Sequence, residues 1–173
     1  MQIIPDRLVL REMTEEDYPA LYAILSDPET MRYYPQPYDE AGTRRWIAWC
    51  RDSYAKHGFG LWAVTLDGEF IGDCGITLQN IHGNICPEIG YHIRRDHWRK
   101  GYASEAARAC MDYIFEHTQF QSLYSYMKYT NEASAKTALS YGCRFVDKYE
   151  VSVNTQTLVF AITRDQWQKR QEA

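Results

Sequence analysis

The alternation of apolar and polar residues along the chain predicts seven strands, each bounded by turn residues. Between the second and third of them, Asp67-Gly68 has the composition of a two-residue hairpin turn. His82-Gly83-Asn84 marks another turn further along. We therefore expect strands over residues 7–11, 61–66, 70–78, 85–93, 123–129, 145–151 and 157–163.

Four segments have the signals of helices. Thr14, followed by Glu-Glu-Asp, is typical of a helix start, and this helix should reach about residue 26. In residues 102–116 the apolar positions recur at spacings of three and four, which predicts one buried helix face. Two further helices are expected over residues 39–56 and 132–141, and the Tyr- and Pro-rich residues 27–38 should form an irregular aromatic loop.

This order of elements predicts one α+β domain that spans residues 1–173. We expect a mixed, mostly antiparallel, twisted sheet of about seven strands, flanked by about four helices. A chain of this length buries roughly 70% of its unfolded surface when it folds, so it needs no disulfide or metal to hold it together. No linker, repeat or low-complexity tract interrupts it.

The junction between the strand at 85–93 and the helix at 102–116 is suited to binding phosphate groups. Backbone N–H groups at a helix start lack partners within the helix, and the helix dipole adds positive charge there. Gly101 and Ala103 leave room for a pyrophosphate to approach the backbone, and Arg99 and Lys100 supply charge. The alternative is an ordinary strand–loop–helix connection with a solvated basic turn.

A second group of residues follows this junction along the chain. It consists of Asn131-Glu-Ala-Ser134 and then Gly142, and its order and spacing relative to the junction are characteristic. Together they resemble the GCN5-related N-acetyltransferases, most closely the branch with the ribosomal-protein N-terminal acetyltransferases. That family's turn, Gln/Arg-x-x-Gly-x-Gly/Ala, is matched by residues 98–103, with Trp98 in place of Gln or Arg. The branch often has an acidic residue where this chain has Gln156.

The resemblance implies acetyl-coenzyme A as the acyl donor and no metal. It also implies that the strands at 85–93 and 123–129 splay apart to admit the pantetheine arm. The cofactor-binding residues implied by the matched positions and their flanks are Ile93, Arg99, Lys100, Gly101, Tyr102, Ala103, Ser104 and Asn131.

Transfer of an acetyl group to an amine requires a neutral nitrogen and a proton for the departing thiolate. Glu88 is the candidate base, because burial beside the acetyl group would raise its pKa; the alternative is a structural or solvated carboxylate. His92 shares a strand face with Glu88 and is a second candidate, although a lone strand histidine is more often structural.

Ser134 is the second expected catalytic residue. The resemblance places it beside the cofactor's sulfur, while its alternative role is a hydrogen bond at the helix start. Many members of the superfamily have a tyrosine acid where this chain has Ala138, which favours the serine. The acceptor side should be lined by Tyr33, Tyr34 and Tyr38, with Trp46 and Trp49 as further specificity candidates or core residues.

The composition of the chain limits the kinds of partner and the cellular location that we expect for it. The net charge of −4 argues against a nucleic-acid partner, and no apolar run approaches the length of a membrane span. The five cysteines show no C-x-x-C pairing and read as small apolar residues in a reducing compartment. With no visible signal peptide, the cytoplasm is the expected location, and a homodimer is plausible through the last strands.

The sequence thus predicts an acetyl-coenzyme A-dependent N-acetyltransferase that works by direct transfer in a ternary complex. The acceptor would be a primary amine on a small molecule, a peptide or a protein N-terminus. Two alternatives stay open: a non-catalytic acyl-coenzyme A-binding or regulatory module, and a transferase for a different acyl group.

Overall fold

The computed structural model describes residues 1–152 and 155–173 and confirms the predicted α+β fold. The strands are β1 (Gln2–Ile3), β2 (Leu8–Arg11), β3 (Leu61–Leu66), β4 (Glu69–Ile81), β5 (Asn84–Ile93), β6 (Ser122–Lys128), β7 (Arg144–Ser152) and β8 (Thr155–Thr163). The helices are α1 (Tyr18–Leu25), α2 (Glu40–His57), α3 (Tyr102–His117), α4 (Glu132–Ser140) and α5 (Arg164–Gln171), with 3-10 turns at Glu15–Asp17 and Arg95–His97.

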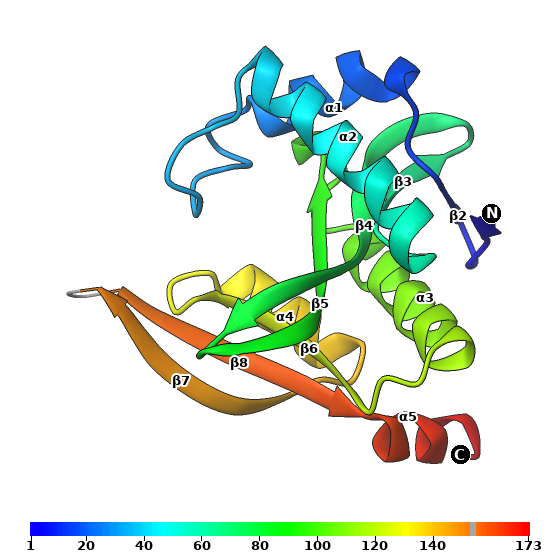
Figure 1. Cartoon of the computed structure of the whole chain (residues 1–173), viewed down its shortest axis with the longest axis vertical. Helices are drawn as coiled ribbons and strands as arrows, with labels where there is room; N and C mark the ends of the chain where they lie inside the picture. Colours follow the sequence, from blue (N-terminus) through cyan, green and yellow to red (C-terminus); the bar gives the residue numbers. More distant parts are fainter. Residues whose placement is uncertain (153–154) are drawn as a thin grey trace.

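The strands form one mixed sheet in the order β1-β2-β3-β4-β5-β6-β8-β7 (Figure 1). Neighbouring strands run antiparallel except β5 and β6, which are parallel. The hairpin between β3 and β4 turns at Asp67 and Gly68, whose φ angles are 50° and 83°. Two positive φ angles are what a tight turn matching the strand twist requires, so the predicted hairpin is confirmed.

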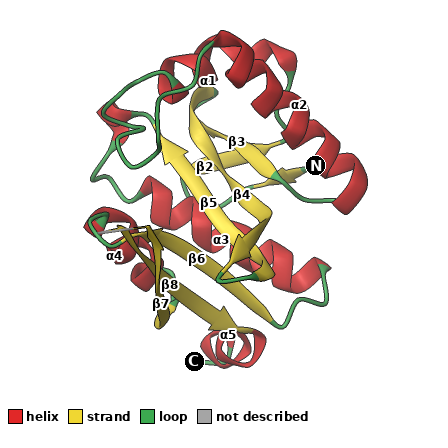
Figure 2. Cartoon of the chain, turned by 60° about the vertical axis from the view of Figure 1, so that its left-hand side comes forward, coloured by secondary structure: helices red, strands yellow, loops and turns green. Residues whose placement is uncertain are grey.

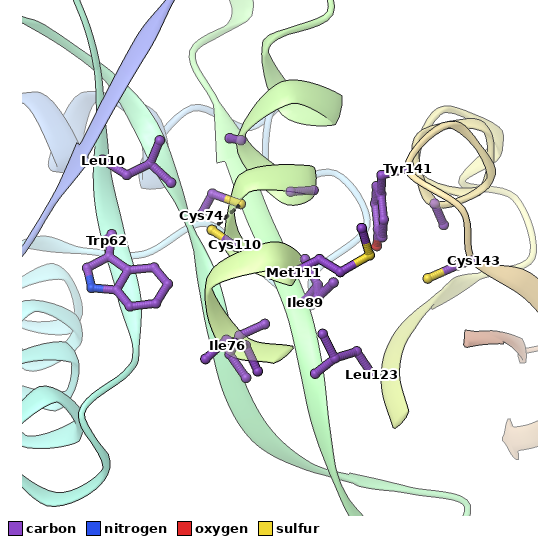
Figure 3. Close-up of a cluster of buried hydrophobic side chains, with 14 of the residues drawn as sticks. Leu10, Trp62, Cys74, Ile76, Ile89, Cys110, Met111, Leu123, Tyr141 and Cys143 are labelled. Atoms are coloured by element: carbon purple, nitrogen blue, oxygen red, sulfur yellow. Dashed lines mark hydrogen bonds between the residues drawn. The ribbon is translucent and has the colours of Figure 1, made fainter. Parts of the chain in front are cut away.

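Two apolar clusters cover opposite faces of β3 and its neighbours, because successive strand residues point to opposite faces. Leu61 and Ala63 pack with α1 and α2, whereas Trp62 and Val64 pack with α3. The larger cluster, part of which Figure 3 shows, continues through α3 to α4 and β6. Four of the five cysteines help to fill the two clusters, and these four act as small apolar residues, as predicted.

The sheet divides between β5 and β6. In the described residues these strands share one register pair, Glu88 with Tyr124, after which they diverge. Figure 2 shows the result: β2 to β5 form one part of the sheet, and β6, β8 and β7 form the other. The splay implied by the family resemblance is thus present in the fold.

Two elements were not expected from the sequence, namely the short β1 and the C-terminal α5. The residues of α5 are mostly polar, so they show little helical periodicity. Tertiary contacts hold the helix instead: Trp167 stacks obliquely on Phe115 at 5.2 Å, and its Nε1 donates to Asp112 Oδ1 at 2.7 Å. Within the described residues, no helix is long and apolar enough to cross a membrane.

Candidate active site

A cleft of about 1210 Å³ opens where β5 and β6 separate. Its walls come from α2, from the loop between α1 and α2, from β5 and β6, and from the N-terminal ends of α3 and α4. The cleft therefore connects the predicted phosphate-binding junction with the predicted acceptor-side aromatics.

One end of the cleft is the start of α3. Gly101, the residue before this helix, has a φ of 82°, and Arg99 has a φ of 61°. Residues with positive φ angles in a short loop turn successive backbone N–H groups toward one concave surface, and such a surface suits an anion. In the described part of the chain no side chain caps this end, so the first N–H groups of a 16-residue helix face the cleft without a partner.

Most of the residues predicted to bind the cofactor lie together in this cleft. Those that line it are Ile93, Arg99, Gly101, Tyr102, Ala103, Ser104 and Asn131. Lys100 differs: it is exposed and does not line the cleft, and its carbonyl oxygen accepts a hydrogen bond from Arg7 Nη1 at 3.0 Å. A phosphate role for the Lys100 side chain stays a prediction.

Arg7 braces the predicted phosphate-binding loop, residues 98–103, through contacts with Lys100, Tyr102 and Glu105. Its backbone N–H and its Nε both donate to the Glu105 carboxylate at 2.7 Å, and its guanidinium lies 4.5 Å from the centre of the Tyr102 ring. One arginine thus ties the chain before β2 to Lys100, Tyr102 and Glu105. The sequence analysis missed this residue, because nothing in the local pattern connects position 7 with position 105.

Trp98 stands where the family motif has Gln or Arg, and the fold explains the substitution. Its indole Nε1 donates to the Ile93 carbonyl at 2.6 Å, which fixes the loop to the end of β5. The ring also packs against the core. The aromatic residue therefore shapes the loop through a hydrogen bond to the backbone.

At the start of α4, Asn131 caps the helix through the backbone of Ser134, a contact that the sequence analysis did not predict. Asn131 Oδ1 accepts from the Ser134 N–H at 3.2 Å, which leaves the Ser134 hydroxyl free for other partners. That hydroxyl lies 3.0 Å from Tyr91 Oη, and both residues line the cleft. Burial raises the pKa of Tyr91 to about 12, so its hydroxyl holds its proton at neutral pH. Sequence reasoning missed Tyr91, although strand alternation places it opposite Glu88 on β5.

Glu88 lies on β5 at the point where the sheet splits. Its Oε2 accepts from Thr77 Oγ1 at 3.2 Å, and Thr77 in turn accepts from Gln79 Nε2 at 3.0 Å. Burial raises the pKa of Glu88 to about 7, against the opposing effects of the Thr77 hydrogen bond and the nearby His92. A carboxylate with this pKa exchanges a proton readily at neutral pH.

His92 lies four residues after Glu88 on the same face of β5 and is 7% exposed. Its Nδ1 is 2.8 Å from Asp73 Oδ1, and its Nε2 is 2.8 Å from Tyr34 Oη. Asp73 is fully buried and also accepts from Trp46 Nε1 at 3.0 Å. The sequence analysis identified His92 but not its buried partner Asp73.

The aromatic loop between α1 and α2 forms the outer wall. Tyr33 Oη donates to the Thr130 carbonyl at 3.2 Å, so this loop reaches across to the start of α4. Tyr38 packs edge-on against Trp46 at 5.3 Å, and both line the cleft. The predicted acceptor-side tyrosines, Tyr33, Tyr34 and Tyr38, thus gather at one end of the cleft. Among residues 1–152 and 155–173, no group of three or more His, Cys, Asp or Glu side chains is placed to hold a metal ion.

Comparison with known proteins agrees with this geometry. The model of the acetyltransferase (GNAT) domain matches residues 7–144. A Bacillus subtilis (strain 168) protein, YkkB, described as uncharacterized, is 38% identical over 147 residues, which cover 83% of this chain and 86% of YkkB.

Solved structures share the fold. An acetyltransferase from Agrobacterium tumefaciens str. C58 superposes with a TM-score of 0.80 and 28% identity, covering 94% of each chain. The ribosomal L7/L12 alpha-N-protein acetyltransferase RimL, solved with coenzyme A, superposes with a TM-score of 0.81 and 17% identity. That match covers 96% of this chain and 99% of RimL.

Proposed function

The chain belongs to the acetyltransferase (GNAT) family and is an acyltransferase, and we propose that it moves an acetyl group from acetyl-coenzyme A directly to a primary amine. One observation carries this proposal: an uncapped helix start and a half-buried carboxylate with a raised pKa lie in the same cleft. The first suits a pyrophosphate, and the second suits proton removal from an amine.

The donor side fits coenzyme A. Gly101 and Ala103 present no bulk in front of the N–H groups of α3, and Arg99 adds a positive charge at the same end of the cleft. The separation of β5 from β6 leaves backbone groups of β5 open to a pantetheine arm. Acetyl-coenzyme A would supply an activated thioester carbonyl, and the protein's part is to hold and orient it.

On the acceptor side, Glu88 takes a proton from the nitrogen as the new C–N bond forms. The Ser134 hydroxyl and its neighbour Tyr91 lie on the other side of β5, where they donate a hydrogen bond to the sulfur as the C–S bond breaks. The acceptor is a small-molecule amine or the N-terminus of a peptide or protein, bound against the tyrosines of the aromatic loop.

Incubation with acetyl-coenzyme A and a panel of amines tests the proposal. The panel contains polyamines, amino acids, lysine peptides and peptides with free N-termini, with thiol release followed and products identified by mass. Replacement of Ser134 by alanine should reduce turnover while coenzyme A affinity stays near that of the wild type. Cofactor binding without turnover of any amine would favour a binding module, and faster reaction with another acyl donor would favour a different transferase.

A further inference from the structure

Four side chains from four parts of the chain form a hydrogen-bonded row that ends at the cleft. Trp46 from α2 and His92 from β5 both bond to Asp73 on β4, and Tyr34 from the aromatic loop bonds to His92. Asp73 is fully buried and His92 almost so, whereas Tyr34 is 40% exposed. The row therefore leads from the interior of the protein to the acceptor side of the cleft.

The hydrogen bonds assign a direction to this row. The Asp73 carboxylate accepts from Trp46 Nε1, from the His92 backbone N–H at 3.1 Å and from His92 Nδ1. Because a carboxylate only accepts, Nδ1 carries the ring proton, and Nε2 presents its lone pair to the Tyr34 hydroxyl. Tyr34 then donates to His92 and keeps lone pairs for a donor in the cleft.

Glu88 and Tyr34 face the same part of the cleft. Both line it, His92 shares its face of β5 with Glu88, and Tyr34 Oη lies 2.8 Å from His92 Nε2. In the relay that follows, the acceptor amine lies between the Glu88 carboxylate and the Tyr34 oxygen.

The reaction has more protons to remove than one carboxylate can hold. An amine that enters as an ammonium ion loses one proton before it can attack and a second one when the amide forms. At pH 7 this applies to about nine-tenths of α-amines and to nearly all alkylamines. Glu88 takes up one proton at a time, so a second acceptor beside it allows both to leave within the closed site.

We propose that Asp73, His92 and Tyr34 form a proton-accepting relay that neutralises the acceptor ammonium before Glu88 acts. An N–H bond of the ammonium breaks, and its proton joins Tyr34 Oη as the Tyr34 proton passes to His92 Nε2. The nitrogen keeps the electron pair, and the resulting imidazolium is paired with the Asp73 carboxylate. Glu88 takes the second proton as the C–N bond forms. Of the two protons removed from the nitrogen, one is taken up by the thiolate when the C–S bond breaks, and the other leaves to solvent.

This inference rests on the proposed amine acetylation. Tyr34 is the residue that touches the amine, and His92 and Asp73 are positioning residues that act through it. The titratable groups that interact electrostatically with Tyr34 or Asp73 are Glu88 on β5, Cys74 on β4, Cys50 and Tyr54 on α2, Tyr38 in the aromatic loop and Tyr126 on β6.

The test compares wild type with Tyr34→Phe and His92→Gln on an alkylamine acceptor at pH 7 and at higher pH. At pH 7 both variants should lose about 10- to 100-fold in kcat/KM for the amine. The loss should shrink as the pH approaches the acceptor's own pKa, because the amine then enters neutral. Glu88→Gln should show no such recovery, since the second proton must still be removed. Tyr22→Phe on α1, outside the cleft, is the matched control for loss of a tyrosine hydroxyl.

Acetylation of the amine by the wild-type protein establishes the transferase activity. The relay is tested independently, by comparing the variants with the wild type. A loss in Tyr34→Phe that is equal at both pH values, or an activity within twofold of wild type, would overturn the relay and leave the transferase standing. Nitrogen NMR of the imidazole gives a second readout that does not depend on activity. The relay requires a proton on Nδ1 and none on Nε2 in neutral His92, and the opposite tautomer would also overturn it.

Discussion

Glu88 and Tyr124 form the single register pair that joins β5 to β6 in the described residues, so the candidate base lies at the point where the sheet opens. One strand position thereby serves two purposes. It anchors the two parts of the sheet, and it holds a carboxylate at the mouth of the gap that we propose admits the donor. A side chain at such a point is partly desolvated, which accounts for the raised pKa of Glu88.

Replacement of Glu88 by glutamine should lower kcat by about 10²- to 10³-fold, because the site loses its nearest proton acceptor. Wild type should show an ascending limb in its pH–rate profile near pH 7, the value at which Glu88 ionises, and the variant should lack that limb. Steady-state rates across the pH range check this. Glu12→Gln, at an exposed position, is the control for the charge change. An unchanged limb in Glu88→Gln would assign the base elsewhere.

Replacement of Thr77 by valine should move the same limb upward by roughly one pH unit. The Thr77 hydroxyl stabilises the charged carboxylate at 3.2 Å, so its removal raises the pKa of Glu88 further. Valine keeps the shape of the side chain. The control is Thr65→Val, which removes a hydroxyl that bonds to the Val9 carbonyl on the neighbouring strand β2. If the ascending limb of the pH–rate profile stayed at the same pH in Thr77→Val, ionisation of Glu88 would not be the cause of that limb.

Glu88→Gln should also make the protein more resistant to unfolding above neutral pH. The folded protein binds a proton at Glu88 up to about pH 7, whereas the ordinary carboxyl value is 4.5, so wild-type stability falls as the pH rises between these values. Glutamine abolishes that fall. Relative to the difference at pH 4.5, the variant should gain about 1–3 kcal/mol at pH 8, measured by urea unfolding. A constant difference between the two proteins at all pH values would contradict this explanation.

Arg7→Ala should raise the KM for acetyl-coenzyme A by about 3- to 10-fold with little change in kcat, because the change loosens the phosphate-binding loop and leaves the acceptor side intact. Arg7 holds Lys100, Tyr102 and Glu105 through its hydrogen bonds and its contact with the ring. Coenzyme A titration by calorimetry checks the donor affinity. Arg108→Ala removes another cation, which lies on α3 in the same shallow surface groove that Arg7 lines, and should leave the KM for acetyl-coenzyme A unchanged. If both changes raised the KM equally, the effect of Arg7 would come from its positive charge alone and not from its hydrogen bonds to the loop.

The periodicity and turn residues of the sequence were sufficient for much of the fold, and they also indicated residues that the structure brings together at the start of α3. Asp67-Gly68 predicts its hairpin because few residues adopt positive φ angles readily. The residues from Arg99 to Ser104 predict an anion site because glycine and small residues before a helix have a local geometric meaning. Likewise, Glu88 and His92 share a face through the two-residue repeat of a strand. Each of these predictions depends on neighbours within a few positions.

Long-range contacts decided the rest. The buried Asp73 beside His92, the brace from Arg7 to Glu105 and the pairing of Tyr91 with Ser134 each join residues far apart in the chain. The pKa of Glu88 likewise depends on how the whole fold excludes water from one carboxylate. Local sequence determines backbone geometry through sterics and periodicity, whereas burial and the meeting of distant polar groups arise only when the tertiary structure closes around them.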